Sequence, residues 1–301
     1  MITPTLLNNR YKILSTLGSG GFGETFLAED TQMPSGRHCV IKKLKPVATN
    51  EPQIDQLIRE RFGREAAILE ELGDSSSQIP KLYAYFNEDE DFYLVQEYIE
   101  GQTLTHKLEQ EGLMSESTLR AILIDILPVL SYVHSKGIVH RDIKPDNIMI
   151  RSFDGKAVLI DFGAVKETMG TIMSASGNSG NSIVIGTPGF MPMEQSVGRP
   201  QFGSDIYSLG LTAIYLLTGK IPQLLETNPH TGEVIWHSNI SPTMRMVLDK
   251  AIKPVARDRY SSAAEMLADL QPVASNFPAT VPNHQAPAYN NNHTPEVAAT
   301  V

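Results

Sequence analysis

The side chains best suited to chemistry are concentrated in one short segment, IVHRDIKPDNIMI, at residues 138–150. Its apolar ends enclose His140, Asp142, Lys144 and Asn147. Apolar residues favour burial, whereas charged groups are rarely buried unless they are paired or bind an ion. The pattern therefore predicts a polar site on a loop whose two ends are anchored in a hydrophobic core.

A second segment, GSGGFG at residues 18–23, matches G-x-G-x-x-G through Gly18, Gly20 and Gly23. Alone this match is weak, because glycine makes up about 7% of residues and a flexible turn fits the pattern too. A dinucleotide-binding fold would place a helix directly after the glycines. Here the alternating segment ETFLAED follows, which predicts a β-hairpin whose bare backbone can lie over phosphate groups.

The first third of the chain has the pattern of a β-sheet with one helix. An amphipathic helix is expected at 53–72, where apolar residues recur at helical spacing and Gly73-Asp74-Ser75 follows as a stop signal. Strand-like segments are 11–18, 24–30, 37–44, 79–86 and 91–99.

Beyond residue 103 the pattern becomes mainly helical. The helix at 115–137 has a serine N-cap, a glycine stop and Pro128 inside it, which should kink it. Residues 147–160 predict a strand, an Asp-Gly turn and a second strand. The other expected helices are 204–218, 242–252 and 261–270.

Composition narrows the class of protein and its compartment. The net charge of −9 argues against general nucleic-acid binding. Cys39 is the single cysteine, so no disulfide forms within the chain, and a reducing cytoplasm is expected. The N-terminus does not resemble a signal peptide, and the apolar segment 206–219 is shorter than the ~20 residues of a membrane span. We therefore expect a cytoplasmic protein without a membrane segment.

Further motifs follow in a fixed order: CVIK at 39–42, HRDIKPDN at 140–147, DFG at 161–163 and GTPGF at 186–190. With the glycine segment they resemble the signature set of the eukaryotic-like (Hanks-type) serine/threonine protein kinases, in their bacterial form. HRD-x-K-x-x-N alone fixes five positions, with a chance of about 3 × 10⁻⁷ per start site at roughly 5% usage each.

The resemblance implies the α+β, bilobal protein-kinase fold over residues 11–270. A β-rich N-lobe with one main helix would span 11–98, and a mainly helical C-lobe would span 99–270. Residues 1–10 would be an N-terminal extension. The Pro- and Asn-rich residues 271–301 have too little apolar content to offset their ordering entropy, so a disordered tail is expected there.

The implied activity is transfer of the γ-phosphate of ATP to Ser/Thr hydroxyls of protein substrates. Asp142 would be the catalytic base, and Lys144 would contact the γ-phosphate and stabilise charge in the transition state. Asn147 and Asp161 would bind Mg²⁺, or Mn²⁺ in its place, through the hard oxygen ligands that such ions prefer. This chemistry depends on positioning and charge neutralisation more than on covalent help.

The phosphate-contacting lysine is either Lys42 or Lys43, which strand alternation puts on opposite faces. The family pattern V-A-I-K maps onto residues 39–42 and selects Lys42, while Lys43 would face solvent. Glu65 matches the helix glutamate that fixes this lysine, and Gln96 would guard the back of the pocket. The implied ATP-binding set is Leu17, Gly18, Ser19, Gly20, Gly21, Phe22, Gly23, Glu24, Thr25, Val40, Lys42, Glu65, Glu97, Ile99 and Met149.

The resemblance also implies structural and regulatory roles. His140 would stack under Phe162, and Asp205 would anchor the backbone of the catalytic loop. Glu194 would pair with Arg259, although Pro192-Met193-Glu194 departs from the family's A-P-E.

Residues 164–187 would form the activation loop, whose phosphate Arg141 would receive. Thr187 matches the family threonine that touches Asp142 and Lys144. We expect autophosphorylation within 171–182, which a homodimer would allow in trans. The candidate phosphosites are Thr171, Ser174, Ser176, Ser179 and Ser182.

Two alternatives to an active kinase are a catalytically silent scaffold of the same fold and a nucleotide-binding oxidoreductase. Loss of Lys42, Asp142 or Asp161 would favour the scaffold, and all three are present. The oxidoreductase lacks support because no helical pattern follows the glycines.

Overall fold

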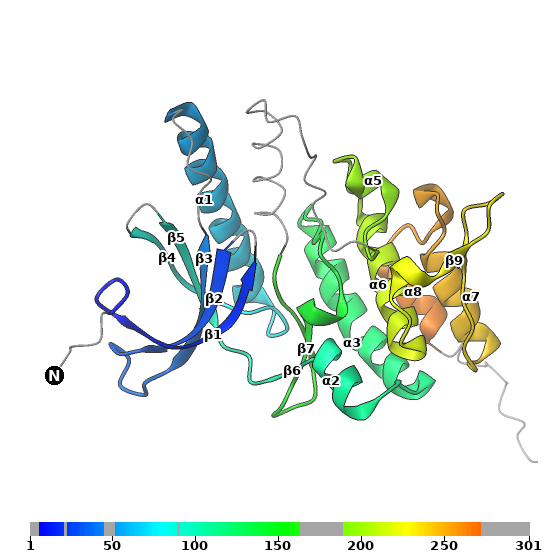
Figure 1. Ribbon diagram of the computed structural model, residues 1–301, viewed down its shortest axis with the longest axis horizontal. Coiled ribbons are helices and arrows are strands. Elements are labelled where there is room, and N and C mark those ends of the chain that lie inside the picture. The colour runs from blue at the N-terminus through cyan, green and yellow to red at the C-terminus, as the bar shows by residue number, and fades with distance from the viewer. Residues whose placement is uncertain (1–5, 21–22, 45–51, 89–90, 163–188, 272–301) are drawn as a thin grey trace, which may run out of the picture. The chain divides into compact units, whose positions relative to one another are not determined.

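The computed structural model describes residues 6–20, 23–44, 52–88, 91–162 and 189–271 (Figure 1). In helix α1 (Pro52–Ser75) it describes only the backbone, and not the side chains, of residues 52–61 and 64–65. Contacts divide the chain into a unit of residues 1–271 and a second unit of residues 272–301. All that follows concerns the first unit.

The N-lobe contains a five-stranded antiparallel sheet with the strand order β1-β2-β3-β5-β4 (Figure 1). Helix α1 lies between β3 and β4 in the sequence and extends three residues beyond the expected 53–72. The strands are β1 (Tyr11–Gly20), β2 (Gly23–Asp30), β3 (His38–Leu44), β4 (Leu82–Glu88) and β5 (Asp91–Glu97).

Alternation along β3 gives this strand two different faces. Cys39 and Ile41 are buried in a small core that also contains Tyr11 and Val95. The residues that alternate with them along the strand then lie on the other face of the sheet. This face carries Val40 and Lys42 to the candidate site.

The C-lobe is mainly helical, and serine caps fix where several of its helices begin. The Ser115 hydroxyl accepts a hydrogen bond from the N–H of Thr118, and the Ser241 hydroxyl accepts one from Met244. The helices are α2 (Leu104–Glu111), α3 (Glu116–Ser135), α5 (Met193–Ser196), α6 (Phe202–Thr218), α7 (Pro242–Ala251) and α8 (Ala263–Leu270), with 3₁₀ turns η1 (Pro145–Asn147), η2 (Pro222–Leu224) and η3 (Ala256–Asp258).

The C-lobe core is built from one face each of α3, α7 and α8 around the almost fully buried α6. The apolar segment 206–219 is therefore a core helix, as the sequence indicated. Helix α3 is long and apolar enough to cross a membrane by length and composition alone, but Leu123, Leu127 and Val133 on it are buried in this core.

Short strands complete the C-lobe. A three-stranded sheet of β6 (Gly101–Thr103), β7 (Ile148–Arg151) and β8 (Ala157–Leu159) lies beside residues 140–147, because η1 leads directly into β7. Between β7 and β8 the chain turns at Gly155, whose φ of 70° suits glycine. A two-residue pair, β9 (Glu226–Thr227) and β10 (Val234–Ile235), forms a separate hairpin.

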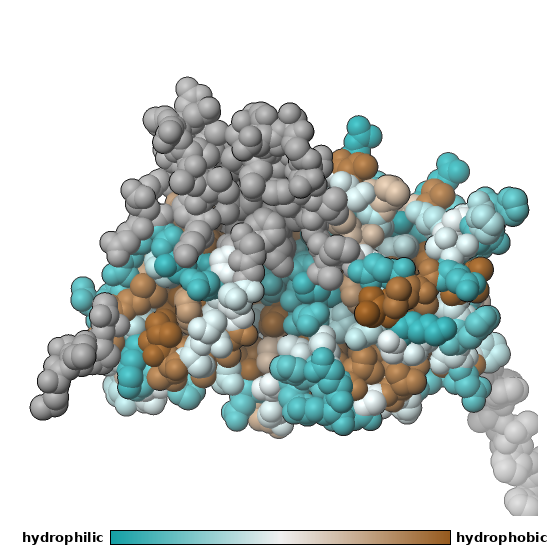
Figure 2. Space-filling view, in the orientation of Figure 1, coloured by the Kyte–Doolittle hydropathy of each residue, from teal (hydrophilic) through white to brown (hydrophobic). Residues whose placement is uncertain are grey.

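The structure thus has the expected α+β architecture, with a sheet-rich N-lobe and a helical C-lobe. In Figure 2 hydrophilic and hydrophobic residues are interspersed over the visible surface. Exposed apolar side chains on β1 include Ile13, Leu14 and Leu17, of which Leu17 borders the cavity described below.

Candidate nucleotide-binding and catalytic site

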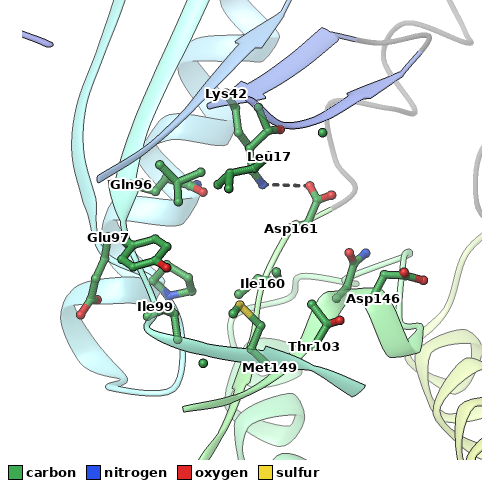
Figure 3. Close-up of a pocket in the computed structure, with 17 residues that line it drawn as sticks. Leu17, Lys42, Gln96, Glu97, Ile99, Thr103, Asp146, Met149, Ile160 and Asp161 are labelled. Atoms are coloured by element: carbon green, nitrogen blue, oxygen red, sulfur yellow. Dashed lines mark hydrogen bonds and ion pairs between the residues drawn. The ribbon is translucent and has the colours of Figure 1, made fainter. Parts of the chain in front are cut away.

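A cavity of about 470 Å³ is lined by residues from both lobes (Figure 3). Its size is within the range of about 300–1,000 Å³ that is typical of small-ligand pockets. The lining residues are Leu17, Gly18, Thr25, Val40, Lys42, Pro80, Gln96, Glu97, Tyr98, Ile99, Gly101, Thr103, Asp146, Asn147, Met149, Ile160 and Asp161.

The cavity has an apolar part and a charged end. In Figure 3, Leu17 lies above and Met149 and Ile160 lie below, while Glu97 and Ile99 close one side. Lys42 and Asp161 lie toward the opposite side. A flat apolar group therefore fits between the lobes, with an anionic group next to the lysine.

The two adjacent lysines of β3 have different partners. Lys42 Nζ lies 3.0 Å from Asp161 Oδ1 and borders the cavity. Lys43 Nζ lies 2.7 Å from Asp91 Oδ2, and hydrogen bonding to Asp91 raises the pKa of Lys43. Lys43 is thus in an ion pair, where the sequence suggested solvent. Glu65 is in α1, but its side chain is outside the described part.

Three polar residues of the 140–147 segment form a cluster beside the charged end. Asp142 is buried, and its Oδ2 accepts a hydrogen bond of 2.8 Å from Asn147 Nδ2. Lys144 Nζ lies 3.4 Å from the same oxygen. Because Asn147 also lines the cavity, this residue links the Asp142 cluster to the pocket.

Asn147 and Asp161 suit a hard cation that also binds a ligand's oxygens. Nδ2 of Asn147 makes both described hydrogen bonds to Asp142, so Oδ1 is the atom of this side chain that can ligate a metal. Within the described ranges, no group of three or more His, Cys, Asp or Glu side chains could hold a metal by itself. Mg²⁺ commonly binds through one or two protein ligands, waters and phosphates, so the residues present fit Mg²⁺.

His140 is a buried neutral group that supports the backbone. Its Nε2 lies 3.2 Å from the Ile160 carbonyl, which only accepts, so Nε2 carries the proton. Nδ1 then accepts a hydrogen bond of 3.3 Å from the N–H of Asp142. Burial lowers the pKa of His140, which favours this neutral form. Its ring centroid lies 4.5 Å from that of Phe162.

Asp205, near the start of α6, holds the backbone before Asp142. Its carboxylate accepts hydrogen bonds of 2.8 Å from the N–H groups of His140 and Arg141. His134 Nε2 lies 2.8 Å from the same carboxylate, a partner that the sequence reasoning missed. Arg141 has a φ of 70°, a conformation that costs a non-glycine residue on the order of 1–3 kcal/mol.

Glu194 and Arg259 form a bidentate pair. Arg259 Nη1 and Nη2 donate to the two carboxylate oxygens at 2.6 and 3.2 Å, and Ser204 Oγ donates to Glu194 at 2.7 Å. Burial acts to raise the pKa of Glu194, but the bonds from Arg259 and Ser204 outweigh it, so the net pKa is lowered. Met193 leaves this pairing intact, because its own side chain is exposed.

Several expected residues do not line the cavity or cannot be described. Ser19, Gly20, Gly23 and Glu24 are in the β1–β2 hairpin and are not lining residues. A Cβ at Gly23 would overlap the carbonyl oxygen of Lys43, so this position requires glycine. Outside the described residues lie Gly21, Phe22, Thr187 and the candidate phosphosites Thr171, Ser174, Ser176, Ser179 and Ser182.

Sequence reasoning missed part of the lining, namely Pro80, Tyr98, Gly101, Thr103, Asp146 and Ile160. One of them carried a usable signal in the sequence. Thr103 is the N-cap of α2, where a threonine followed by a helical segment marks a helix start. The reason for glycine at 101 is visible only in the structure, where a Cβ would overlap the Ile150 carbonyl oxygen.

Comparison with known proteins decides the family. A family model described as protein kinase domain matches residues 11–270. The chain belongs to the protein kinase family. The kinase fold is also seen in the solved "PpkA-294 apo form" (TM-score 0.70, 23% identity, 90% of this chain and 99% of that chain) and in the Mycobacterium tuberculosis PknI kinase domain (TM-score 0.63, 22% identity, 90% and 98%).

Two similar curated kinases come from Nostoc and Synechocystis. Serine/threonine-protein kinase PknA of Nostoc sp. strain PCC 7120 is 64% identical over 283 residues, covering 93% of this chain and 50% of that protein. Serine/threonine-protein kinase C of Synechocystis sp. strain PCC 6803 is 57% identical over 284 residues, covering 93% and 53%. The chain thus spans about half the length of these kinases.

Proposed function

We propose that this protein is an ATP-dependent serine/threonine protein kinase. The observation that carries the proposal is the position of Asn147, which lines the cavity and also donates to the buried Asp142. A nucleotide cavity and a candidate base are thereby joined through one side chain. Family membership and relatives named as serine/threonine kinases support the same activity.

ATP binding follows from the two parts of the cavity. The adenine would lie between Val40 and Leu17 on one side and Met149 and Ile160 on the other. The backbone at Glu97 and Ile99 would supply hydrogen bonds; the N–H of Glu97 already donates to Lys81 O at 2.8 Å, which leaves its carbonyl as the acceptor. Gln96 would border the base.

The charged end would hold the phosphates. Lys42 would contact them, oriented by Asp161 and, as the resemblance implies, by Glu65. Asn147 and Asp161 would hold the Mg²⁺ or Mn²⁺. The bound cation would supply charge neutralisation on the phosphate oxygens.

The transfer step uses the cluster beside the cavity. Asp142 accepts the proton of the substrate hydroxyl as that oxygen forms a bond to the γ-phosphorus. The bond between this phosphorus and the bridging oxygen breaks, and ADP leaves with that oxygen. Lys144 stabilises the charge on the transferring group. Acceptance of a proton by a positioned base contributes about 10²–10⁴-fold to rate.

Regulation, domain limits and location extend the proposal. The catalytic domain would be residues 11–270, acting on protein substrates in the cytoplasm. Autophosphorylation at 171–182, in trans within a homodimer, would place a phosphate within reach of Arg141. Thr187 would help select Ser/Thr acceptors.

The test is transfer of labelled γ-phosphate from ATP, with Mg²⁺, to the protein itself and to a generic basic protein. Asp142→Asn should lower the transfer rate by about 10²-fold or more. ATP affinity should stay near that of the wild type, because Asp142 does not line the cavity. An inactive wild type that still binds ATP would favour the scaffold alternative, and equal activity of the variant would remove Asp142 from the mechanism.

A further inference from the structure

Gln195 makes a contact with the catalytic loop that none of the motifs assigns. It lies in α5 and is buried, with 6% of its surface exposed. Its Nε2 donates a hydrogen bond of 2.6 Å to the carbonyl oxygen of Arg141. This carbonyl belongs to the peptide unit that joins Arg141 to Asp142.

Both polar atoms of that peptide unit are held by side chains. Gln195 holds the carbonyl oxygen, and Nδ1 of His140 accepts from the N–H of Asp142. A peptide unit is planar, so fixing its two polar atoms fixes the orientation of the plane. The direction in which the Asp142 side chain leaves the backbone is thereby restricted.

The backbone at this point needs such support. Arg141 has a φ of 70°, in the left-handed region that L-residues rarely adopt. Strained conformations of this kind persist where surrounding interactions determine them, often at functional sites. The N–H of Arg141 is held by Asp205 and its carbonyl by Gln195, from two different helices.

The donor comes from a fixed element. The neighbouring Glu194 is bound by Arg259 and Ser204, which anchors α5 to the C-lobe. The amide orientation is also determined, because Oε1 facing the Arg141 carbonyl would bring two acceptors together. Oε1 is buried and makes no hydrogen bond to the described residues, so Nε2 supplies the described polar contact of this amide.

We propose that Gln195 is a positioning residue for phosphoryl transfer, acting by fixing the peptide unit before Asp142. The inference rests on the proposed kinase activity and adds α5 to the elements that position the base. Misplacement of a catalytic group by about 1 Å can reduce rate by about 10²-fold, so loss of this bond should affect kcat. Gln195 does not line the cavity, so KM for ATP should not change.

The first variant is Gln195→Met, which keeps the length of the side chain and removes the donor. We expect kcat to fall about ten- to hundredfold, with KM for ATP within about twofold of the wild type. Ser196→Ala is the matched control on the same helix, because Ser196 Oγ donates within α5, to Met193 O. It should leave kcat unchanged.

The second variant, Gln195→Glu, gives a signature that packing alone would not produce. A protonated carboxyl can donate its O–H to the Arg141 carbonyl, whereas an ionised carboxylate repels it. Burial raises the pKa of a carboxyl, so protonation should occur at accessible pH. The ratio of kcat for Gln195→Glu to kcat for wild type should therefore rise as pH falls from about 8 to about 6, while the ratio for Gln195→Met stays flat.

Three other results of these kinetic experiments would overturn the inference. Wild-type kcat in folded Gln195→Met, or a flat ratio for Gln195→Glu, would show that the bond does not position the base. Parallel losses of ATP affinity and thermal stability in Gln195→Met would show a purely structural role. An inactive wild type would instead refute the proposed function, and this inference with it.

Discussion

Lys42 and Lys43 show how one residue's position on a strand determines its chemistry. Lys42 faces the cavity and Asp161, whereas Lys43 pairs with Asp91 on the other side of β3. If Lys42 contacts the phosphates, Lys42→Met should reduce kcat/KM for ATP by about 10²-fold or more, as expected for loss of a preorganised charge. Steady-state kinetics with ATP as the varied substrate would measure this.

Lys43→Met is the matched control, because it removes the same charge from the neighbouring position. It should leave kcat/KM within about threefold of the wild type, as an ion pair that is partly exposed contributes little. Equal losses in the two variants would mean that net charge, and not the position of Lys42, supports ATP binding.

Among single residues, local motifs placed some, and the family resemblance supplied the long-range contacts of Glu194 and Asp205, whereas other long-range contacts had no signal in the sequence. Alternation was enough to place Val40 and Lys42 on one face of β3. The contact between Gln195 and Arg141 joins residues that are 54 positions apart, and neither the residue types nor their spacing in the sequence indicates it. The same holds for His134, which meets Asp205 only after α3 and α6 pack together.

At the scale of elements, the Glu194–Arg259 pair should determine whether α5 stays anchored to the rest of the C-lobe. Arg259 is buried, so Glu194→Ala would leave its guanidinium without a counter-charge. Removing one partner of a buried pair costs about 3–5 kcal/mol of unfolding free energy. Urea unfolding would measure the loss, and phosphoryl transfer should fall with it because α5 carries Gln195.

An exposed pair of the same type serves as the comparison. Lys253 and Glu233 also form an ion pair, but both side chains are over a third exposed. Glu233→Ala should therefore be indistinguishable from the wild type in the same urea titration. If the two variants lost similar stability, the burial of Arg259 would not be what makes the Glu194 pair important.

Long elements were predicted well because their signals are local. Apolar spacing gave α3, α7 and α8 to within about two residues, which is the usual uncertainty of helix ends, and a serine cap was a further signal for α3. Helix α1 continues through Gly73 to Ser75, past the expected stop, since Leu72 is fully buried and packing outweighs the weak helix propensity of glycine. The elements α5 and β6 are too short for a periodic pattern of apolar residues to reveal them.

For the whole molecule, the last helix of the protein kinase domain should mark where the chain can be shortened. Helix α8 buries Ala263, Met266 and Leu270, and Arg120 on α3 donates to the Leu270 carbonyl at 2.6 Å. A protein ending at residue 271 should keep the melting temperature and transfer activity of the full chain, because the described core ends at Leu270.

A protein ending at residue 261 should not fold, because it lacks the buried apolar side chains of α8. Each large buried side chain that is lost costs about 2–5 kcal/mol, and the sum approaches a total stability of about 5–15 kcal/mol. Thermal unfolding followed by circular dichroism separates the two cases. A lower melting temperature for the protein that ends at residue 271 would show that residues 272–301 contribute to the stability of the protein kinase domain.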